Sequence, residues 1–427
     1  MAVCFFNNDY KSKYSCEYEI KKNGIEVRID YDIDDEIEPD SNGIKSYGVN
    51  TKFDKRDILI IDYKNKANYL LKDANYNGHS EVFGTPDDSY RTKFFSNCYF
   101  IDNNYNKLSN LKPNPKIKKI KIYSDIINEF IGHPSLSEES SDDEFIIKLK
   151  RDTIKQNILI EKNNIKSLII SDDWDYTHSF KNNDIQIKLN GYVEIEVSKR
   201  INYYDAYDYI RELMVYIQLL RPDKMTINKI SVCIDEIYYD YFLPIREIKY
   251  NDSYVAKSVD DNFLTYLSKC YELIPFRNSK TEVRNIPYII FDTSRNLEDN
   301  FLTFYRFIEC YYKKQKIKGI VNNFVFYSFE NNYKRSKTMA KCEKEKLCQE
   351  IISLRNHYIH SGYYIKNHSI KIKFKKVGKQ VNPKNYTANN VDFKWIYKRT
   401  KILYDIVIDI IFRNMLEIED YNFKRHF

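Results

Sequence analysis

The sequence predicts an α+β protein with a β-rich N-terminal domain over residues 1–255 and an all-α bundle over residues 256–427. Apolar and polar residues alternate through much of the first 200 positions, as they do in half-buried strands. From about Asp260 onward, apolar residues recur every three or four positions over long stretches, as they do in amphipathic helices. A chain of 427 residues is long enough to form two domains, each with its own core.

The first predicted element is a β-hairpin that turns at Asn23–Gly24. Asn-Gly is the strongest short signal for a two-residue type I′ turn. Such a turn would place Ile20 opposite Val27 and Tyr18 opposite Ile29, so the apolar faces of the two strands would agree.

The second Asn-Gly pair, Asn190–Gly191, predicts a hairpin of another kind. A two-residue turn there would set Ile187 opposite Glu194, which mixes apolar and charged faces. We therefore expect an odd loop with a bulge and Gly191 at positive φ. Further strands are predicted at residues 58–63, 117–123, 145–149 and 225–234.

Two acidic stretches, residues 30–38 and 138–144, interrupt the predicted strands. They are most simply solvated loops. Because they would repel phosphates, they argue against a nucleic-acid surface in those places.

Four helices are predicted from the 3.6-residue period. One spans about Tyr203 to Leu220 and ends before Pro222, because proline cannot continue a helix. The other three carry apolar stripes over residues 297–311, 347–358 and 396–410.

The predicted helix that includes residues 347–358 carries the residues that most clearly indicate a specific chemistry. Arg355 is followed directly by Asn356, and His360 lies five positions after the arginine. Arginine stays protonated and can grip a phosphate through its planar fork, while histidine can take or give a proton near neutral pH. These are the groups that RNA phosphodiester cleavage needs.

Counting about 100° per residue separates two faces of this helix. The core stripe holds the apolar positions Leu347, Ile351, Leu354 and Tyr358. The arc with Arg355, Asn356 and His360 also holds Ile352 and Ile359, and a purely solvated face would rarely carry two isoleucines. We therefore expect this second face to meet another helix or a second copy of the protein.

A structural interpretation competes with the catalytic one. Arginine and histidine five residues apart occur by chance in many long chains, and a histidine on a helix is more often structural than catalytic. For Arg355 and His360 alone the structural interpretation leads. The addition of Asn356, the apolar second face and the terminal His-Ser-Gly turn reverses that order.

A basic segment over residues 366–390 follows the motif helix and contains no Asp or Glu. Lys371, Lys373 and Lys375 alternate with apolar residues, the pattern of a strand with one basic face. This pattern predicts an RNA-binding surface that holds phosphates. A solvated basic hairpin is the alternative interpretation.

Composition limits the remaining possibilities. The formal charge of +7 is compatible with a polyanionic partner without requiring one. Eight scattered Cys lack zinc-site spacing, and no segment has the roughly 20 apolar residues that cross a bilayer. Glu194 is followed by Ile-Glu rather than by the Glu-x-Lys spacing of metal-dependent restriction-type nucleases. We therefore expect no metal, no cofactor, no membrane and a cytoplasmic location.

The residues Arg355-Asn356-x-x-x-His360 resemble the RxxxxH signature of HEPN-domain ribonucleases, with its polar residue after the arginine. The two-part layout resembles that of ApeA-like anti-phage defence proteins. The resemblance implies a HEPN-type helical bundle and a metal-independent endoribonuclease acting in abortive infection. It also implies a homodimer or higher even-numbered oligomer with facing motifs, and an N-terminal sensor or brake answering a phage-derived trigger.

The resemblance assigns a role to each motif residue. His360 would act as base or acid, Arg355 as phosphate clamp, and Asn356 would orient His360 or the phosphate. Two other functions stay open: a non-catalytic HEPN-like module that binds RNA or scaffolds a partner, and a toxin held by a separate antitoxin.

Overall fold

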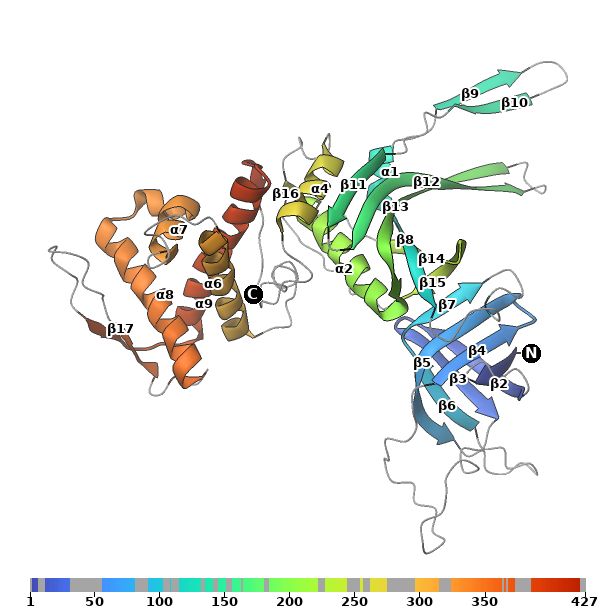
Figure 1. The fold of residues 1–427 in the computed structure, drawn as a ribbon, viewed down its shortest axis with the longest axis horizontal. Helices are drawn as coiled ribbons and strands as arrows, with labels where there is room; N and C mark the ends of the chain where they lie inside the picture. Colours follow the sequence, from blue (N-terminus) through green and yellow to red (C-terminus); the bar gives the residue numbers. More distant parts are fainter. Residues whose placement is uncertain are drawn as a thin grey trace, which may run out of the picture. The chain divides into compact units, whose positions relative to one another are not determined.

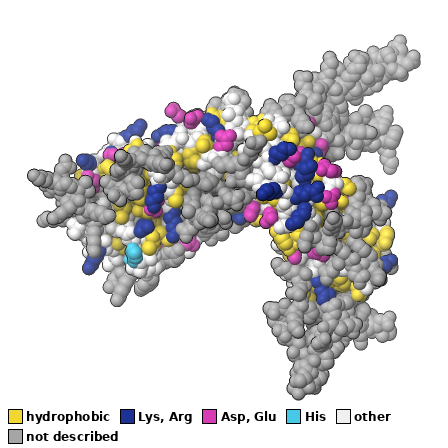
Figure 2. All heavy atoms as spheres, viewed as in Figure 1, with side chains coloured by type: hydrophobic (Ala, Val, Ile, Leu, Met, Phe, Trp, Pro, Cys, Tyr) yellow, Lys and Arg dark blue, Asp and Glu magenta, His cyan; other side chains and the backbone are white. Residues whose placement is uncertain are grey.

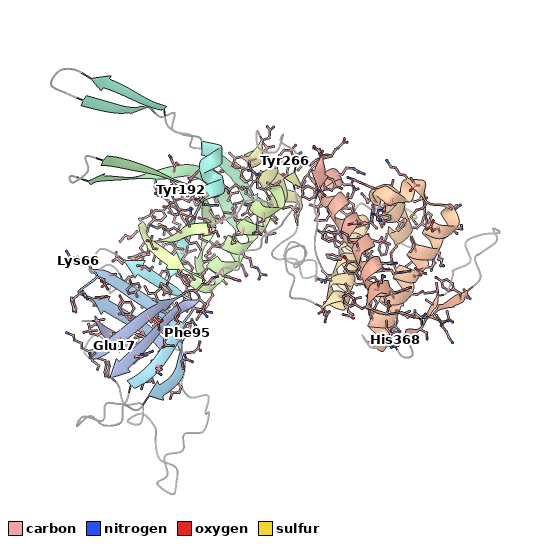
Figure 3. The ribbon with its side chains drawn as sticks, turned by 180° about the vertical axis from the view of Figure 1, so that it is seen from behind. Glu17, Lys66, Phe95, Tyr192, Tyr266 and His368 are labelled. Carbon is pink, nitrogen blue, oxygen red and sulfur yellow. The ribbon has the colours of Figure 1, made fainter. Side chains whose placement is uncertain are left out.

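The computed structural model describes most of the chain, which is drawn as a ribbon in Figure 1 and with its described side chains in Figure 3. The described residues are 2–6, 12–30, 56–80, 91–102, 108, 115–131, 135–140, 145–150, 156–162, 164–179, 184–221, 227–243, 254–255, 262–274, 296–314, 324–362, 365, 368–372 and 385–422.

The chain divides into two compact units. The first consists of residues 1–211 and 226–247, and the second of residues 212–225 and 248–427. The division falls inside helix α2 (Tyr203–Leu220), so this one helix contributes residues to both units.

The N-terminal part of the first unit is a closed antiparallel barrel of six strands (Figure 1). Its strands are β1 (Ala2–Phe6), β2 (Tyr14–Lys21), β3 (Gly24–Asp30), β4 (Arg56–Asp62), β5 (Ala67–Ser80) and β6 (Arg91–Ser96). The ring closes because β5 pairs with both β4 and β6. Ile25, Val27 and Ile29 alternate along β3 and are fully buried in the barrel core, as the period of two predicts.

Strand β5 changes partner at Lys72–Asp73, where the barrel joins the rest of the sheet. Its first residues pair with β7, its last residues pair with β6, and Asp73 has a φ of +47°. Buried Lys72 forms an ion pair with Asp57, and the Tyr203 hydroxyl donates to Asp73 at 2.5 Å. The irregular backbone is therefore held by a polar cluster.

The sheet continues from β5 through seven further strands in the order β7, β15, β14, β8, β13, β12 and β11. Their bounds are β7 (Tyr99–Asp102), β8 (Lys116–Ser124), β11 (Gln156–Lys162), β12 (Ile165–Ser179), β13 (Asp184–Asn202), β14 (Ile227–Ile234) and β15 (Ile237–Phe242). Helix α1 (Asp125–Ile131) follows β8, and β9 (Ser135–Ser140) pairs with β10 (Phe145–Lys150). Strands were predicted at β4, β8, β10 and β14, and the structure confirms them.

The register of the first hairpin differs from the prediction. Ile20 pairs with Ile25 and Tyr18 with Val27, so the turn lies at Lys22–Asn23. Gly24 belongs to β3 instead, where β6 approaches so closely that a Cβ would lie 2.2 Å from the Ser96 carbonyl oxygen. The glycine therefore serves the contact between strands rather than the turn.

The predicted hairpin at Asn190–Gly191 is absent from the structure. Strand β13 runs straight through this pair, and β12 pairs with it over Ser179–Asp184 to Ile165–Val197. The Gly191 N–H donates to the Asn128 side chain at 2.5 Å. The predicted loop over residues 138–144 is also partly wrong, because Glu138 and Glu139 lie in β9. Residues 31–38 and 141–144 lie outside the described residues.

The second unit contains most of the helices among the described residues. They are α4 (Phe263–Leu273), α6 (Leu297–Lys314), α7 (Phe324–Asn332), α8 (Lys341–Ser361) and α9 (Phe393–Asp409), with a 3₁₀ turn over Lys334–Thr338 and a π-helical turn over Ile410–Met415. Helix α6 packs against α8 through Phe301 and Tyr358 and against α9 through Phe304 and Tyr404. The three helices predicted for this part correspond to α6, α8 and α9.

The predicted fold class is wrong, because the second unit is not all-α. Strand β16 (Tyr254–Val255) pairs with β19 (Tyr421–Asn422), and β17 (Ile370–Ile372) pairs with β18 (Tyr386–Ala388). The first unit in turn carries α1 and the start of α2. The protein is a mixed α/β fold with a six-stranded barrel, and only the β-rich character of its N-terminal part agrees with the prediction.

Candidate functional site

Helix α8 carries the three motif residues near its C-terminal end. Ile351, Leu354 and Tyr358 of the predicted core stripe are buried on one side, whereas Leu347 is only partly buried. On the other side Arg355 is half-buried, whereas Asn356 and His360 are exposed. The helix ends at Ser361 and is followed by its C-cap residue Gly362, whose φ of +76° favours glycine.

Arg355 is held by two neighbours. Its Nη1 donates a hydrogen bond of 3.0 Å to Oδ1 of Asn356, and its guanidinium lies 5.6 Å from the centre of the Tyr305 ring on α6. Burial raises the pKa of Tyr305 to about 12, although the charge of Arg355 acts to lower it. The tyrosine therefore stays neutral and offers its ring face to the cation. Asn356 thus contacts Arg355, whereas the sequence had suggested His360 or the phosphate as its partner.

His360 and Ile359 form the outer surface of the last turns of α8. Ile359 is 42% exposed, and Ile352 is partly exposed about two turns earlier. Within the described part of the chain, neither Arg355 nor His360 forms an ion pair with a carboxylate. The motif face therefore combines exposed apolar surface with groups able to meet an anion.

A buried polar cluster connects α8 with its neighbours five residues before the motif. Glu350 is 3% exposed and accepts a hydrogen bond of 3.1 Å from Nε of Arg399 on α9, together with one from Nη2. The Tyr386 hydroxyl on β18 donates to the same carboxylate. Burial, then the hydrogen bond to Glu350, raises the pKa of Tyr386 well above its ordinary value.

This cluster was missed in the sequence, although a signal was present. Glu350 lies among the apolar positions of its helix, and Arg399 lies between the buried Ile396 and Leu403 of its own. A carboxylate and a guanidinium in two apolar stripes predict a buried pair, because neither charge is stable in a core alone.

Only part of the basic segment over residues 366–390 lies among the described residues. This part forms the short antiparallel pair of β17 and β18. Lys371 is exposed in β17 and pairs across the ladder with Thr387 of β18. Strand β18 also contacts α8, because the Tyr386 hydroxyl donates a hydrogen bond to Glu350. Lys373 and Lys375 lie outside the described residues.

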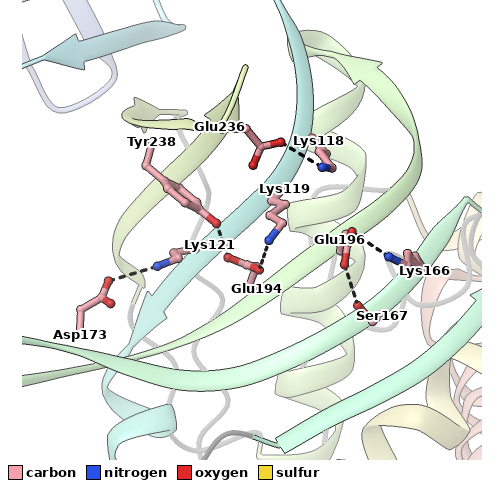
Figure 4. A network of polar contacts seen from close by, with 10 residues as sticks. All are labelled: Lys118, Lys119, Lys121, Lys166, Ser167, Asp173, Glu194, Glu196, Glu236 and Tyr238. Atoms are coloured by element: carbon pink, nitrogen blue, oxygen red, sulfur yellow. Dashed lines mark hydrogen bonds and ion pairs between the residues drawn. The ribbon is translucent and has the colours of Figure 1, made fainter.

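A second charged region lies on the open face of β12, β13, β8 and β14 in the first unit (Figure 4). Lys119 forms an ion pair of 3.3 Å with buried Glu194, to which the Tyr238 hydroxyl also donates. Lys121 lies 3.4 Å from Asp173. In Figure 2 this region shows dark blue and magenta side chains gathered together.

The same pairing extends to the edges of this face. Lys166 pairs with Glu196 at 3.1 Å and Lys229 with Asp240 at 2.8 Å. Glu194 and Glu196, considered from the sequence for metal-dependent chemistry, are thus engaged by lysines. We name this region the paired sheet face.

The described residues contain neither a metal-binding cluster nor a membrane-spanning helix. No group of three or more His, Cys, Asp or Glu side chains there is arranged to hold a metal ion. None of the helices there has the length and apolar character needed to cross a membrane. Comparison of the chain with protein-family models, curated proteins and solved structures finds no match.

Proposed function

We propose that this protein is a metal-independent endoribonuclease whose site is built on α8 from Arg355, Asn356 and His360. One observation carries the proposal: Arg355 and His360 lie on the accessible part of one helix with no carboxylate partner among the described residues. An anionic ligand therefore meets no competing negative charge in an ion pair with either group. The resemblance of this motif to the HEPN signature supports the same chemistry.

The reaction uses the nucleophile that RNA already carries. A base takes the proton of the 2′-hydroxyl, the 2′-oxygen attacks phosphorus, and the bond to the 5′-oxygen breaks as that oxygen receives a proton. The products end in a 2′,3′-cyclic phosphate and a 5′-hydroxyl. In this proposal His360 supplies one proton transfer, and Arg355 stabilises the charge of the crowded phosphorane.

One histidine does not readily serve as base and acid at the same instant, so the proposal includes a homodimer with facing motifs. The exposed Ile359 and partly exposed Ile352 beside the motif support such a contact, since apolar surface is buried favourably between copies. A partner's His360 would then provide the second proton transfer.

We further propose, from the resemblance to ApeA-like proteins, that cleavage serves anti-phage defence by harming the RNA of the infected cell. The first unit would then sense a phage-derived trigger or restrain the second unit.

The test is cleavage of a defined RNA in EDTA by purified wild-type protein, with analysis of the product ends. We expect cyclic phosphate and 5′-hydroxyl ends, and a loss of at least about 100-fold in rate for His360→Ala. The matched control is His368→Asn, which replaces another exposed histidine, at φ of +45°, by a residue that tolerates this backbone. Intact RNA in EDTA, or full activity of His360→Ala, would refute the proposal.

A further inference from the structure

The first turns of α9 expose a row of aromatic residues beside a row of lysines. Phe393 is 66% exposed and stacks on Tyr397, with ring centres 6.4 Å apart and planes inclined by 27°. Lys394 and Lys398 are exposed and follow these rings by one position each, so the two rows run side by side along the helix. We call these four residues the α9 stripe.

Phe393 is not needed to begin helix α9, because other residues cap the helix and pack against its first turn. The Asp392 side chain caps α9 by accepting a hydrogen bond of 2.7 Å from the Trp395 N–H. Val391 and Ile396 are both buried and occupy the positions of a hydrophobic staple. The large exposed surface of Phe393 therefore has no role in these local interactions. Exposed apolar surface of this kind is typical of a binding site.

The charges of the two lysines in the stripe are not neutralised by ion pairs among the described residues. In the described part of the chain, neither Lys394 nor Lys398 forms an ion pair. The carboxylates on the same helix are engaged elsewhere: Asp405 pairs with Lys401 at 3.0 Å, and buried Asp409 pairs with Arg413 at 2.9 Å. The stripe thus offers two positive charges next to two ring faces.

We propose that the α9 stripe binds single-stranded RNA. The bases would stack on Phe393 and Tyr397, and Lys394 and Lys398 would neutralise the neighbouring phosphates. Alternating ring faces and cations suit a single strand, because its bases can turn their π faces outward, whereas a duplex keeps them stacked inside. The assignment rests on the proposed function in taking RNA as the substrate, and it adds that the substrate is unpaired where it meets α9.

Helix α9, which carries the stripe, is joined to the motif helix α8 by a buried ion pair. Arg399 follows Lys398 directly and binds Glu350 of α8, which lies five residues before Arg355. Five residues correspond to about 7.5 Å along a helix axis. An RNA strand held on α9 is therefore bound by an element that is fixed to the helix carrying Arg355.

The experiment measures binding separately from cleavage. A short fluorescent 2′-O-methyl RNA lacks the nucleophilic hydroxyl, so its fluorescence anisotropy reports affinity alone. We expect Phe393→Ala to weaken binding about 5- to 100-fold, and Phe393→Trp to retain it, since loss of one base–aromatic stack has effects of this size. The double variant Lys394→Ala/Lys398→Ala should lower the salt dependence of binding by about 1.4 in the logarithmic slope.

The matched control is Tyr63→Ala, which removes an exposed aromatic residue of the first unit and should leave binding unchanged. A wild-type protein that binds no single strand, one that binds a duplex of the same sequence more tightly, or Phe393→Ala with unaltered affinity would overturn the inference. Cleavage assayed on unmodified RNA keeps the two proposals apart. Binding that depends on Phe393 without any cleavage would contradict the ribonuclease alone, and cleavage with binding independent of Phe393 would contradict the stripe alone.

Discussion

The paired sheet face of the first unit and the motif face of α8 both carry basic side chains, but the two regions differ in whether these side chains are paired with carboxylates. On the sheet face the lysines Lys119, Lys121 and Lys229 each have a carboxylate partner within 3.4 Å. On α8, Arg355 and His360 have no such partner among the described residues. Paired charges on neighbouring strands satisfy one another, whereas unpaired ones remain available to a ligand.

This difference also separates the two regions as candidate nucleic-acid surfaces. The sheet face exposes tyrosines and lysines together, a composition that suggests RNA binding when it is seen alone. Its carboxylates remove that suggestion, because Glu194, Glu196 and Asp173 would repel phosphates. The proposed RNA cleavage and binding are therefore assigned to α8 and α9, and four experiments test this comparison.

The largest effect should come from Arg355→Ala. Loss of the phosphate-stabilising cation should lower the rate of RNA cleavage by about 100- to 1,000-fold. The free energy of unfolding should change by less than about 1 kcal/mol, because the half-buried side chain has no ion pair to lose among the described residues. The matched variant Lys229→Ala on the sheet face should leave cleavage unchanged, and a comparable loss there would break the comparison.

The next effect concerns stability rather than activity. Glu350→Ala leaves Arg399 without its carboxylate in a buried site and should destabilise the second unit by about 3–5 kcal/mol. Trp395 lies 3.9 Å from the Arg399 guanidinium, so its fluorescence reports on this region. Urea unfolding in a Trp174→Phe background, which removes the other tryptophan, measures the change.

A control for the Glu350 experiment comes from an exposed pair. Lys313→Ala, in the same unit as Trp395, should cost less than about 1 kcal/mol, because both partners of its pair with Glu309 are partly solvated. Equal losses in the two variants would show that burial does not distinguish these pairs.

A smaller effect is expected for Lys371→Ala on the hairpin. Removal of one phosphate contact should lower the logarithmic salt slope of single-strand binding by about 0.7 and leave thermal stability unchanged. Titration with uncleavable RNA at several salt concentrations gives the slope. An unaltered slope would remove Lys371 from the RNA-binding surface.

The smallest effect is a pH dependence on the sheet face. Burial acts to raise the pKa of Glu196, but Lys166, together with Lys119 and Ser167, outweighs it, so the pKa lies below its ordinary value of 4.5. A depressed carboxylate pKa stabilises the fold above pH 4.5, and this contribution is lost as the pH falls through the folded-state pKa. Glu196→Gln should therefore cost less than about 1 kcal/mol at pH 7, and the difference should shrink in acid. Urea midpoints at pH 7 and pH 3.5 measure it, and a difference that grows in acid would contradict the pairing.

Local sequence was sufficient for the elements whose signals lie within one segment. The helix over Tyr203–Leu220 and the strands β4, β8 and β14 follow from their own periodicity. The amphipathic pattern of α8 likewise predicted which side of the motif helix is buried. In each case the information sits in residues a few positions apart, where helix and strand periods act directly.

Contacts between distant segments decided the rest. Gly24 reads as a turn residue, yet only the approach of β6 shows why it belongs in a strand. The short ladders β16–β19 and β17–β18 make the second unit mixed rather than all-α, and the β16–β19 pairing joins segments over 160 residues apart. The motif on α8 and the helix that presents it could be predicted from neighbouring residues. Which charges are paired could not, because an ion pair depends on what another part of the folded chain brings within about 4 Å.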